Sequence, residues 1–238
     1  MKLPVVNHQD YVAKINDDNK FPIRKFGELA NYLINQKIVE RFYKPDYCSE
    51  ETLSRAHSLE YIASIKKKTI DTKSQKKIGF PINDSVVNRS FRATGGTVLA
   101  SKLAIDHRIA CNTAGGSHHA TYNEGAGYCV FNDVAVATRY LQSKGYVKNV
   151  LNKNLKELNY NTYDFVFYVA GVDIHLNDRL GKLKISEDGI KRRDEMIINN
   201  FFEKNVPICG VLGGGYNKDF ETLVRLHAIL HKTCASVI

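Results

Sequence analysis

Several features that would assign this 238-residue chain to other classes of protein are missing from it. No apolar run approaches the roughly 20 residues that a membrane-spanning helix requires. The start of the chain, Met1-Lys2-Leu3-Pro4, lacks the apolar segment of a signal peptide, so we expect a cytoplasmic protein with no membrane partner. No internal repeat or low-complexity tract is evident either. The length therefore predicts a single domain, 1–238, with enough residues for a substantial core.

Cysteines are few and follow no metal-binding spacing. The five stand at positions 48, 111, 129, 209 and 234, without a Cys-x-x-Cys pair. An odd number without such spacing argues against a disulfide framework and against a cysteine zinc site, and it favours reduced thiols in the cytosol. For Cys129 the alternatives are a reactive nucleophile and a buried structural thiol, and we expect the second because free cysteines are commonly buried.

Basic residues outnumber acidic ones, which gives a formal net charge of +9 at pH 7 and a pI near 9.2. Such a charge can favour acidic partners such as nucleic acid. The lysines are dispersed, however, apart from clusters at 66–68 and 73–77, and no aromatic platform or nucleic-acid motif accompanies them. We therefore expect a solvated basic surface and no nucleic-acid partner.

Strand and helix patterns alternate along most of the chain. The N-terminal region up to about residue 70 predicts helices, with Ser49 and Ser58 as N-caps, whereas the polar residues 69–87 predict a surface loop. Strands are predicted at 109–111, 164–170 and 206–212, and helices at 88–106, 133–144, 187–204 and 219–235. This alternation predicts a parallel sheet with helices on both faces, and ligands bind such sheets beyond the carboxyl ends of their strands.

Two adjacent histidines, His118 and His119, follow two glycines in the segment Gly-Gly-Ser-His-His-Ala. Imidazole has an unperturbed pKa near neutrality, so two such rings together suit proton transfer. The glycines allow the backbone to turn tightly and to approach a ligand closely. A loop pair that makes only structural hydrogen bonds is the alternative.

Longer motifs surround this pair and recur farther along the chain. They read NTAGGSHHATYNEGAGYCVFNDVAVA at 112–137, YVAGVDIHLNDRLGKLKIS at 168–186 and LGGGYN at 212–217. Together with FPIRKFGELANYLI at 21–34 and RATGGTVLASKLAI at 92–105, they resemble the histone deacetylase family in its broad sense. That family includes bacterial acetoin-utilisation and acetylpolyamine deacetylases, and the form looks closest to its class IV and bacterial members. The resemblance spans nearly the whole chain and implies an arginase/deacetylase-like three-layer α/β fold.

The resemblance also implies a chemistry, the zinc-dependent removal of acetyl groups from acetyl-lysine proteins, acetylpolyamines or similar small amides. In the family, zinc polarises the acetyl carbonyl and activates water, two histidines transfer protons and a tyrosine hydroxyl stabilises the oxyanion. The positions that match are the proton-transfer pair His118 and His119, the oxyanion residue Tyr216, the substrate-binding residues Gly127, Tyr128 and Gly214, and the zinc ligand Asp173. Capping, loop and packing roles are the alternatives for these residues.

Three other positions are weaker candidates for metal binding or catalysis. His175 is a further possible zinc ligand because Asp-x-His can present two ligands, although the family's histidine at this place does not bind the metal. His227 and His231 lie four residues apart, a spacing that suits a metal, but no glutamate follows His227 and we expect ordinary helix residues. We expect Asp178 to be structural.

One departure from the family pattern matters as much as the match. After the helix at 133–144 the family continues into a strand that ends in Asp-x-Asp-x-His-x-Gly-(Asn or Asp)-Gly, which should begin here at 147–150. The chain runs instead into Leu-Asn-Lys-Asn-Leu at 151–155, which resembles a helix much later in the family pattern. Many tens of residues are therefore missing near 150/151. They include two of the three zinc ligands and the carboxylates that hold the histidine pair.

This internal shortening leads to three hypotheses. Catalytic zinc normally takes three protein ligands, so Asp173 alone is not expected to hold it well, and hydrolysis should be impaired. The chain is then an amidohydrolase with a rebuilt metal site, an inactive remnant that keeps an acyl-binding or partner-binding surface, or, with least support, a nucleic-acid-binding protein. We also expect a missing central strand, a gap or a closed-up sheet, and a weak junction near 150/151 that favours oligomerisation.

Overall fold

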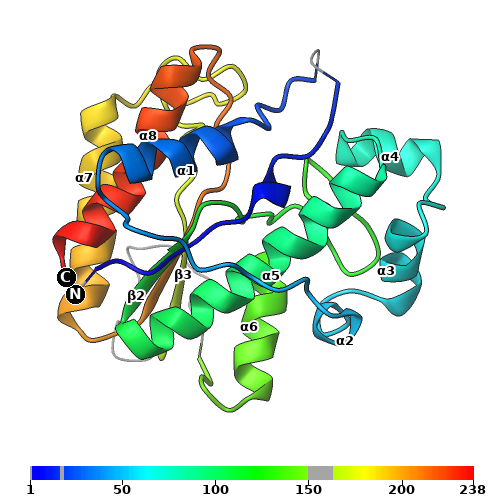
Figure 1. Cartoon of the computed structure of the whole chain (residues 1–238), viewed down its shortest axis with the longest axis horizontal. Coiled ribbons are helices and arrows are strands. Elements are labelled where there is room, and N and C mark those ends of the chain that lie inside the picture. Colours follow the sequence, from blue (N-terminus) through cyan, green and yellow to red (C-terminus); the bar gives the residue numbers. More distant parts are fainter. Residues whose placement is uncertain (1, 17–18, 150–162) are drawn as a thin grey trace.

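The computed structural model describes residues 2–16, 19–149 and 163–238. Its named strands form one parallel sheet in the order β1-β2-β4-β3 (Figure 1). They are β1 (Val5–Val6), β2 (Ile109–Asn112), β3 (Val166–Val169) and β4 (Ile208–Val211). The last three lie where the sequence predicts strands. β1 was not predicted, because two residues are too few to show a periodic pattern.

Helices cover both faces of this sheet, as the alternation of strand and helix predicts (Figure 1). The helices are α1 (Lys25–Asn35), α2 (Glu50–Leu53), α3 (Leu59–Lys66), α4 (Thr72–Ile78), α5 (Asp84–His107), α6 (Asp133–Ser143), α7 (Glu187–Glu203) and α8 (Phe220–Ser236), with a 3₁₀ turn η1 at Gln9–Tyr11. Within the described residues, none of these helices is long and apolar enough to cross a membrane.

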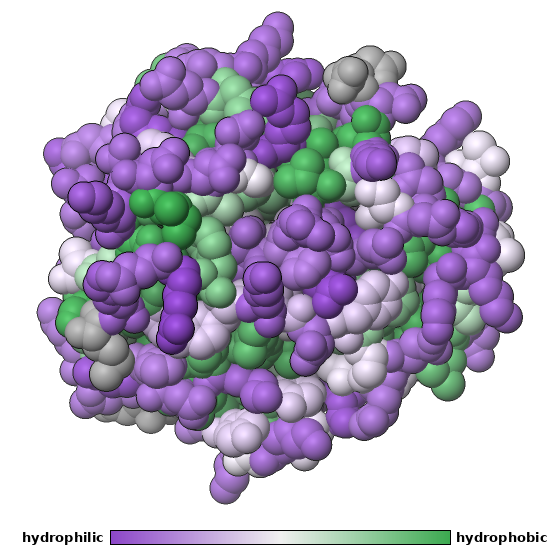
Figure 2. Space-filling model, viewed as in Figure 1, coloured by the Kyte–Doolittle hydropathy of each residue, from purple (hydrophilic) through white to green (hydrophobic). Residues whose placement is uncertain are grey.

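The side chains of the strands alternate between the two helical layers. Ala110 and Cys209 pack in a core cluster with residues of α5 and α6. Ile109 and Ile208, their neighbours along the same strands, join the cluster that α1, α7 and α8 complete. Because successive strand residues point to opposite faces, two apolar layers form around one sheet. The result is the three-layer α/β fold expected from the sequence. The side of the molecule seen in Figure 2 is mostly hydrophilic, with separate hydrophobic patches.

The described strands leave no gap between them. β4 pairs with β2 on one side and with β3 on the other, in continuous register. Val166 and Ala170 donate their N–H groups to the carbonyl oxygens of Pro207 and Val211. Because N–H groups alternate in direction along a strand, those of Phe167 and Val169 point away from β4. The described strands thus lie side by side, with β3 at one edge of the sheet.

The predicted junction at 150/151 lies outside the described residues. The residues that flank this part of the chain are tied together by one carboxylate. Asp164 Oδ2 accepts hydrogen bonds from the N–H groups of Lys148 (2.8 Å) and Asn149 (3.0 Å). These hydrogen bonds lower the pKa of Asp164, and they bring the end of the α6 segment next to the start of β3.

The surface loop predicted at 69–87 is wrong, because this segment contains α4 and the start of α5. Asp71 caps α4 by accepting a hydrogen bond from Ser74 N–H, and Gly79 ends it with a φ of +86°. α4 is polar and buries only Ile78, so it carries no apolar stripe that a periodicity argument could detect. By contrast, Ser49 and Ser58 are confirmed as N-caps of α2 and α3.

A buried histidine on α8 makes the stability of this fold depend on pH. His231 is fully buried, its Nδ1 lies 3.2 Å from the carbonyl oxygen of His227, and desolvation lowers its pKa to about 4. An unfolded histidine titrates near pH 6.5, so between these values the unfolded state binds more protons. This contribution to stability is present above pH 6.5 and is lost as the pH falls towards 4.

We expect His231→Leu to remove about 3 kcal/mol of the acid-induced loss of unfolding free energy. Urea unfolding of wild type and variant between pH 4.5 and 8 measures this difference. Above pH 7 the unfolding free energies of the two proteins should change with pH to a similar extent, because the imidazole is neutral in both the folded and the unfolded state. An equally steep acid loss in both chains would show that His231 does not cause it.

Candidate active site

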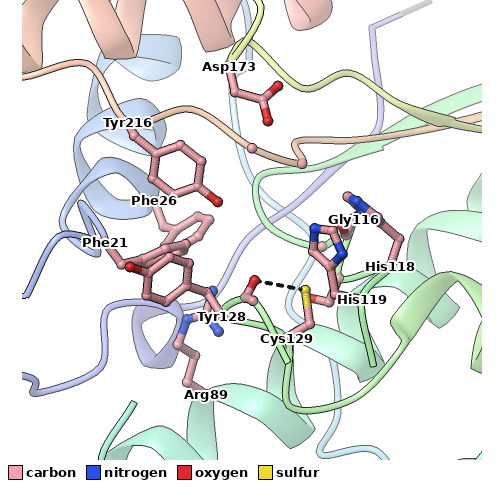
Figure 3. Close-up of a pocket in the computed structure, with 15 residues that line it drawn as sticks. Phe21, Phe26, Arg89, Gly116, His118, His119, Tyr128, Cys129, Asp173 and Tyr216 are labelled. Carbon is pink, nitrogen blue, oxygen red and sulfur yellow. Dashed lines mark hydrogen bonds between the residues drawn. The ribbon is translucent and has the colours of Figure 1, made fainter. Parts of the chain in front are cut away.

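Seven of the residues selected from the sequence lie around one pocket with a cavity volume of about 40 Å³, enough for a few water molecules (Figure 3). They are His118, His119, Gly127, Tyr128, Asp173, Gly214 and Tyr216. The segments that carry them follow β2, β3 and β4. Because parallel strands end at the same edge of a sheet, residues about a hundred positions apart converge there.

The loop after β2 presents the histidine pair at this edge. Gly115 and Gly116 have φ values of +84° and +79°, and a Cβ on Gly116 would lie 2.6 Å from the backbone nitrogen of Gly213. Only glycine fits this turn without strain. The rings of His118 and His119 then stand with their centroids 4.1 Å apart.

Hydrogen bonding defines the tautomer of His118. Its Nδ1 lies 2.9 Å from the carbonyl oxygen of Gly116. Since a carbonyl oxygen only accepts, Nδ1 carries the hydrogen, and Nε2 of the neutral ring is left as an acceptor. His119 has a lowered pKa because of desolvation and the neighbouring His118, although Asp173 acts in the opposite direction. His119 is therefore mostly neutral at pH 7.

A buried carboxylate, which the sequence analysis did not single out, holds this loop in place. Asp133 accepts hydrogen bonds from the N–H groups of Ser117 (2.7 Å) and Gly116 (3.0 Å) and from the hydroxyl of Thr97 (2.5 Å). Desolvation raises the pKa of Asp133, and these hydrogen bonds oppose that rise. The Phe-Asn-Asp motif contained this residue, but its position in the first turn of α6 suggested only a helix start.

Asp173 and Tyr216 face the histidines from the other side of the pocket (Figure 3). The carboxylate of Asp173 covers Gly214 so closely that a Cβ there would lie 2.2 Å from Oδ2, and it accepts no hydrogen bond from the described residues. The Tyr216 hydroxyl points into the pocket. Burial and the neighbouring Asp173 raise its pKa, so it stays protonated and can donate a hydrogen bond.

Asp178 ties the loops of Asp173 and Tyr216 together. Its Oδ2 accepts a hydrogen bond of 2.7 Å from the N–H of Tyr216, and its Oδ1 accepts from Leu180 and Gly181. Gly181 in turn packs on the carbonyl group of Asp173. This arrangement agrees with the structural role expected for Asp178.

Lys25 supports the glycine loop from beneath. It is fully buried, and its Nζ donates to the carbonyl oxygens of Gly215 (3.2 Å) and Gly213 (3.5 Å). Desolvation, followed by the charge of Arg89, lowers its pKa to about 7. In the sequence, Lys25 appears only within the motif at 21–34, and its partners lie 188 and 190 positions away.

Two of the remaining candidates take structural positions. His175 is buried, does not line the pocket, and accepts a hydrogen bond from Asn177 N–H through Nδ1 (3.3 Å). Cys129 lines the pocket, but burial raises its thiol pKa to about 11. A thiol with so high a pKa is a poor nucleophile at neutral pH, in line with the buried role expected for it.

The residues of the pocket do not fit a catalytic zinc ion. Such an ion needs about three converging protein ligands. No group of three His, Cys, Asp or Glu side chains meets in the described part of the chain. Within the described residues, Asp173 therefore lacks the partners that a zinc site requires.

The role of Asp133 leads to a test. Asp133→Asn should lower the unfolding free energy by about 2–3 kcal/mol, because the amide cannot accept from both loop N–H groups and Thr97 as a carboxylate does. Thr97→Val, which removes one of the three donors, should cost about 1 kcal/mol. Urea unfolding gives both values, and NMR of the histidine rings should show changed His118 and His119 signals in Asp133→Asn. Equal stability of that variant and wild type would mean that Asp133 does not hold the loop.

Comparisons with known proteins agree with this geometry. The model of the histone deacetylase domain matches residues 21–153 and 159–230. An uncharacterized protein of Picosynechococcus sp. is 31% identical over 299 aligned positions, which cover 100% of both chains. Since this alignment is longer than the 238 residues of the chain, the relative contains residues that this chain lacks.

Named relatives and solved structures are more distant. Histone deacetylase 2 of Arabidopsis thaliana is 25% identical over 275 positions, covering 86% of this chain and 71% of the relative. The crystal structure of the HDA15 HD domain has a TM-score of 0.79 at 13% identity, covering 99% of this chain and 87% of that one. A histone deacetylase homologue complexed with SAHA has the same TM-score at 18% identity, and the match covers 99% of this chain and 84% of that one. These structures show the same fold, and from the family match, which spans most of its length, the chain belongs to the histone deacetylase family.

Proposed function

We propose that this chain binds N-acylated amines, on a protein lysine or a small molecule, without the zinc-dependent hydrolysis that the family resemblance implies. The observation that carries the proposal is the composition of the pocket. His118, His119, Tyr216 and Asp173 surround it, yet three metal-binding side chains do not converge in the described residues. The pocket thus offers groups that can recognise an acyl amide, whereas the described residues do not supply a set of ligands for activating water on zinc.

The pocket offers a hydrogen-bond donor and an acceptor to such a ligand. The Tyr216 hydroxyl donates to the carbonyl oxygen of the acyl group, and the free Nε2 of His118 accepts from a nearby N–H. Aromatic rings form the wall beside them: the centroids of Phe21 and Tyr128 are 5.0 Å apart, and those of Tyr128 and Tyr216 are 5.9 Å apart. Few polar groups on an apolar wall are typical of pockets for small ligands.

Hydrolysis at a rebuilt metal site is the second candidate. It is favoured by the same convergence of Asp173 with the histidine pair and Tyr216 in one cavity. Tightly bound metal and chelator-sensitive turnover distinguish this activity from binding alone.

We expect purified protein to hold well under one zinc ion per chain after dialysis and to show no measurable deacetylation of acetyl-lysine peptides or acetylpolyamines. Metal analysis and a coupled acetate assay provide the two measurements. Stoichiometric zinc together with chelator-sensitive turnover that Tyr216→Phe abolishes would contradict binding alone and establish the hydrolase.

Binding itself can be tested at Gly127, where a methyl group would enter the pocket. Its φ is +54°, and an added Cβ would lie 2.9 Å from Cδ2 of His119. Gly145 is a matched control, since its φ is +74° and nothing lies within 4 Å of an added Cβ. Both alanine variants should lose about 1–2 kcal/mol of stability from the left-handed backbone.

Only Gly127→Ala should weaken the binding of an acetyl-lysine peptide, by about tenfold or more, which corresponds to about 1.4 kcal/mol. Isothermal titration calorimetry on wild type and both variants measures this effect. Failure of wild type to bind acylated amines would refute the proposed function, and equal losses in both variants would place the binding site elsewhere.

A further inference from the structure

A buried arginine lies at the end of the pocket opposite Asp173 (Figure 3). Arg89 comes from the first half of α5, and only 6% of its surface is exposed. It nevertheless lines the pocket together with Phe21, Phe26 and Tyr128. The cavity thus runs from a carboxylate and a hydroxyl at one end to a guanidinium at the other.

The partners of this guanidinium do not neutralise its charge. Arg89 Nε donates to the carbonyl oxygen of Tyr11 (3.1 Å), and the guanidinium carbon lies 4.8 Å from the ring centroid of Phe26 and 5.6 Å from that of Phe21. Within the described residues Arg89 forms no ion pair, and its Nη1 and Nη2 donate no hydrogen bond to the protein. Arg89 lines the pocket, and neither of these two groups is among the fully enclosed unpaired atoms of the described residues.

A second buried basic residue, Lys25, lies against the same aromatic rings. Lys25 Nζ lies 5.2 Å and 5.4 Å from the same Phe21 and Phe26 rings, and its hydrogen bonds go to carbonyl oxygens. The buried carboxylate of Asp133 is occupied by the histidine loop. Buried charges in proteins are almost always paired, because removing them from water is costly. Arg89 lacks such a partner, because no carboxylate of the described residues forms an ion pair with it, and this points to a ligand that supplies one.

We propose that the floor of this pocket binds a carboxylate group through Nη1 and Nη2 of Arg89. The planar guanidinium presents two parallel N–H donors, which match the two oxygens of a carboxylate. The small cavity restricts the occupant to a short group. Either the far carboxylate of a dicarboxylic acyl group or a free short-chain carboxylate has this chemistry.

The acyl version of this inference rests on the proposed function, whereas the free-carboxylate version does not. In the acyl version, Tyr216 holds the amide carbonyl while Arg89 holds the distal carboxylate, as in an Nε-succinyl-lysine. An uncharged acetyl group would leave Arg89 unpaired. The pocket should therefore prefer acidic acyl groups to acetyl groups.

Isothermal titration calorimetry of the whole chain tests this preference with four probes: an Nε-acetyl-lysine peptide, the matching Nε-succinyl-lysine peptide, sodium acetate and sodium succinate. Wild type should bind the succinyl peptide about tenfold or more tighter than the acetyl peptide, as one charge-assisted bidentate contact permits. Arg89→Met should remove this difference. Lys102→Met, at an exposed position on the same helix, should retain it.

Thermal unfolding of each variant checks that the fold persists. Replacing an unpaired buried cation with an apolar side chain of similar length should not lower the melting temperature. Should Arg89→Met fail to fold, Arg89→Gln keeps a donor for Tyr11 and removes the charge. The preference of wild type for the succinyl peptide over the acetyl peptide is measured without any variant, so it does not depend on whether the variants fold.

The outcomes separate the two proposals. Equal affinity of wild type for the succinyl and acetyl peptides, unchanged in Arg89→Met, would overturn the carboxylate site and leave acyl binding intact. Arg89-dependent binding of free succinate or acetate without binding of either peptide would support the site and refute the proposed function. Absence of binding by all four probes would overturn both.

Discussion

The arrangement of the site depends on the buried carboxylate of Asp133. It joins the start of α6 to Thr97 on α5 and to the backbone of the loop that follows β2. Three hydrogen bonds compensate for its desolvation, so the loop has one well-defined position above the sheet. The histidine rings at the end of that loop, and the close contact of Gly116 with Gly213, depend on this position. A single anion thus aligns two strand ends that the chain separates by about a hundred residues.

On the opposite side of the pocket, two side chains hold the loop that carries Tyr216. Lys25 holds the carbonyl groups of the glycine loop, and Asp178 holds the N–H of Tyr216. Together they position the tyrosine hydroxyl without any metal ligand. The positions of Tyr216 and of the glycine loop therefore depend on contacts within the protein, while the described residues provide no group of three metal-binding side chains.

The described strands form a continuous sheet, because the three longer ones are neighbours. β4 lies between β2 and β3 and bonds to both. Its side chains enter the clusters on both faces, so the central strand of the described sheet is fully buried. Asp164 then joins the residues before and after the undescribed segment 150–162. This parallel sheet with helices on both faces accounts for the shared fold and the TM-score of 0.79 to both solved structures.

The sequence alone determined the class of fold, the three longer strands, the helix caps at Ser49 and Ser58, and the motif residues that meet in the pocket. These features follow from local periodicity, from capping chemistry and from motifs contiguous in the chain. It did not reveal β1 or α4, which are too short or too polar to show periodicity. Nor did it reveal the roles of Asp133, Lys25 and Arg89. Their partners are backbone groups and rings far away in the chain, and only tertiary packing removes these charges from water and decides what they contact.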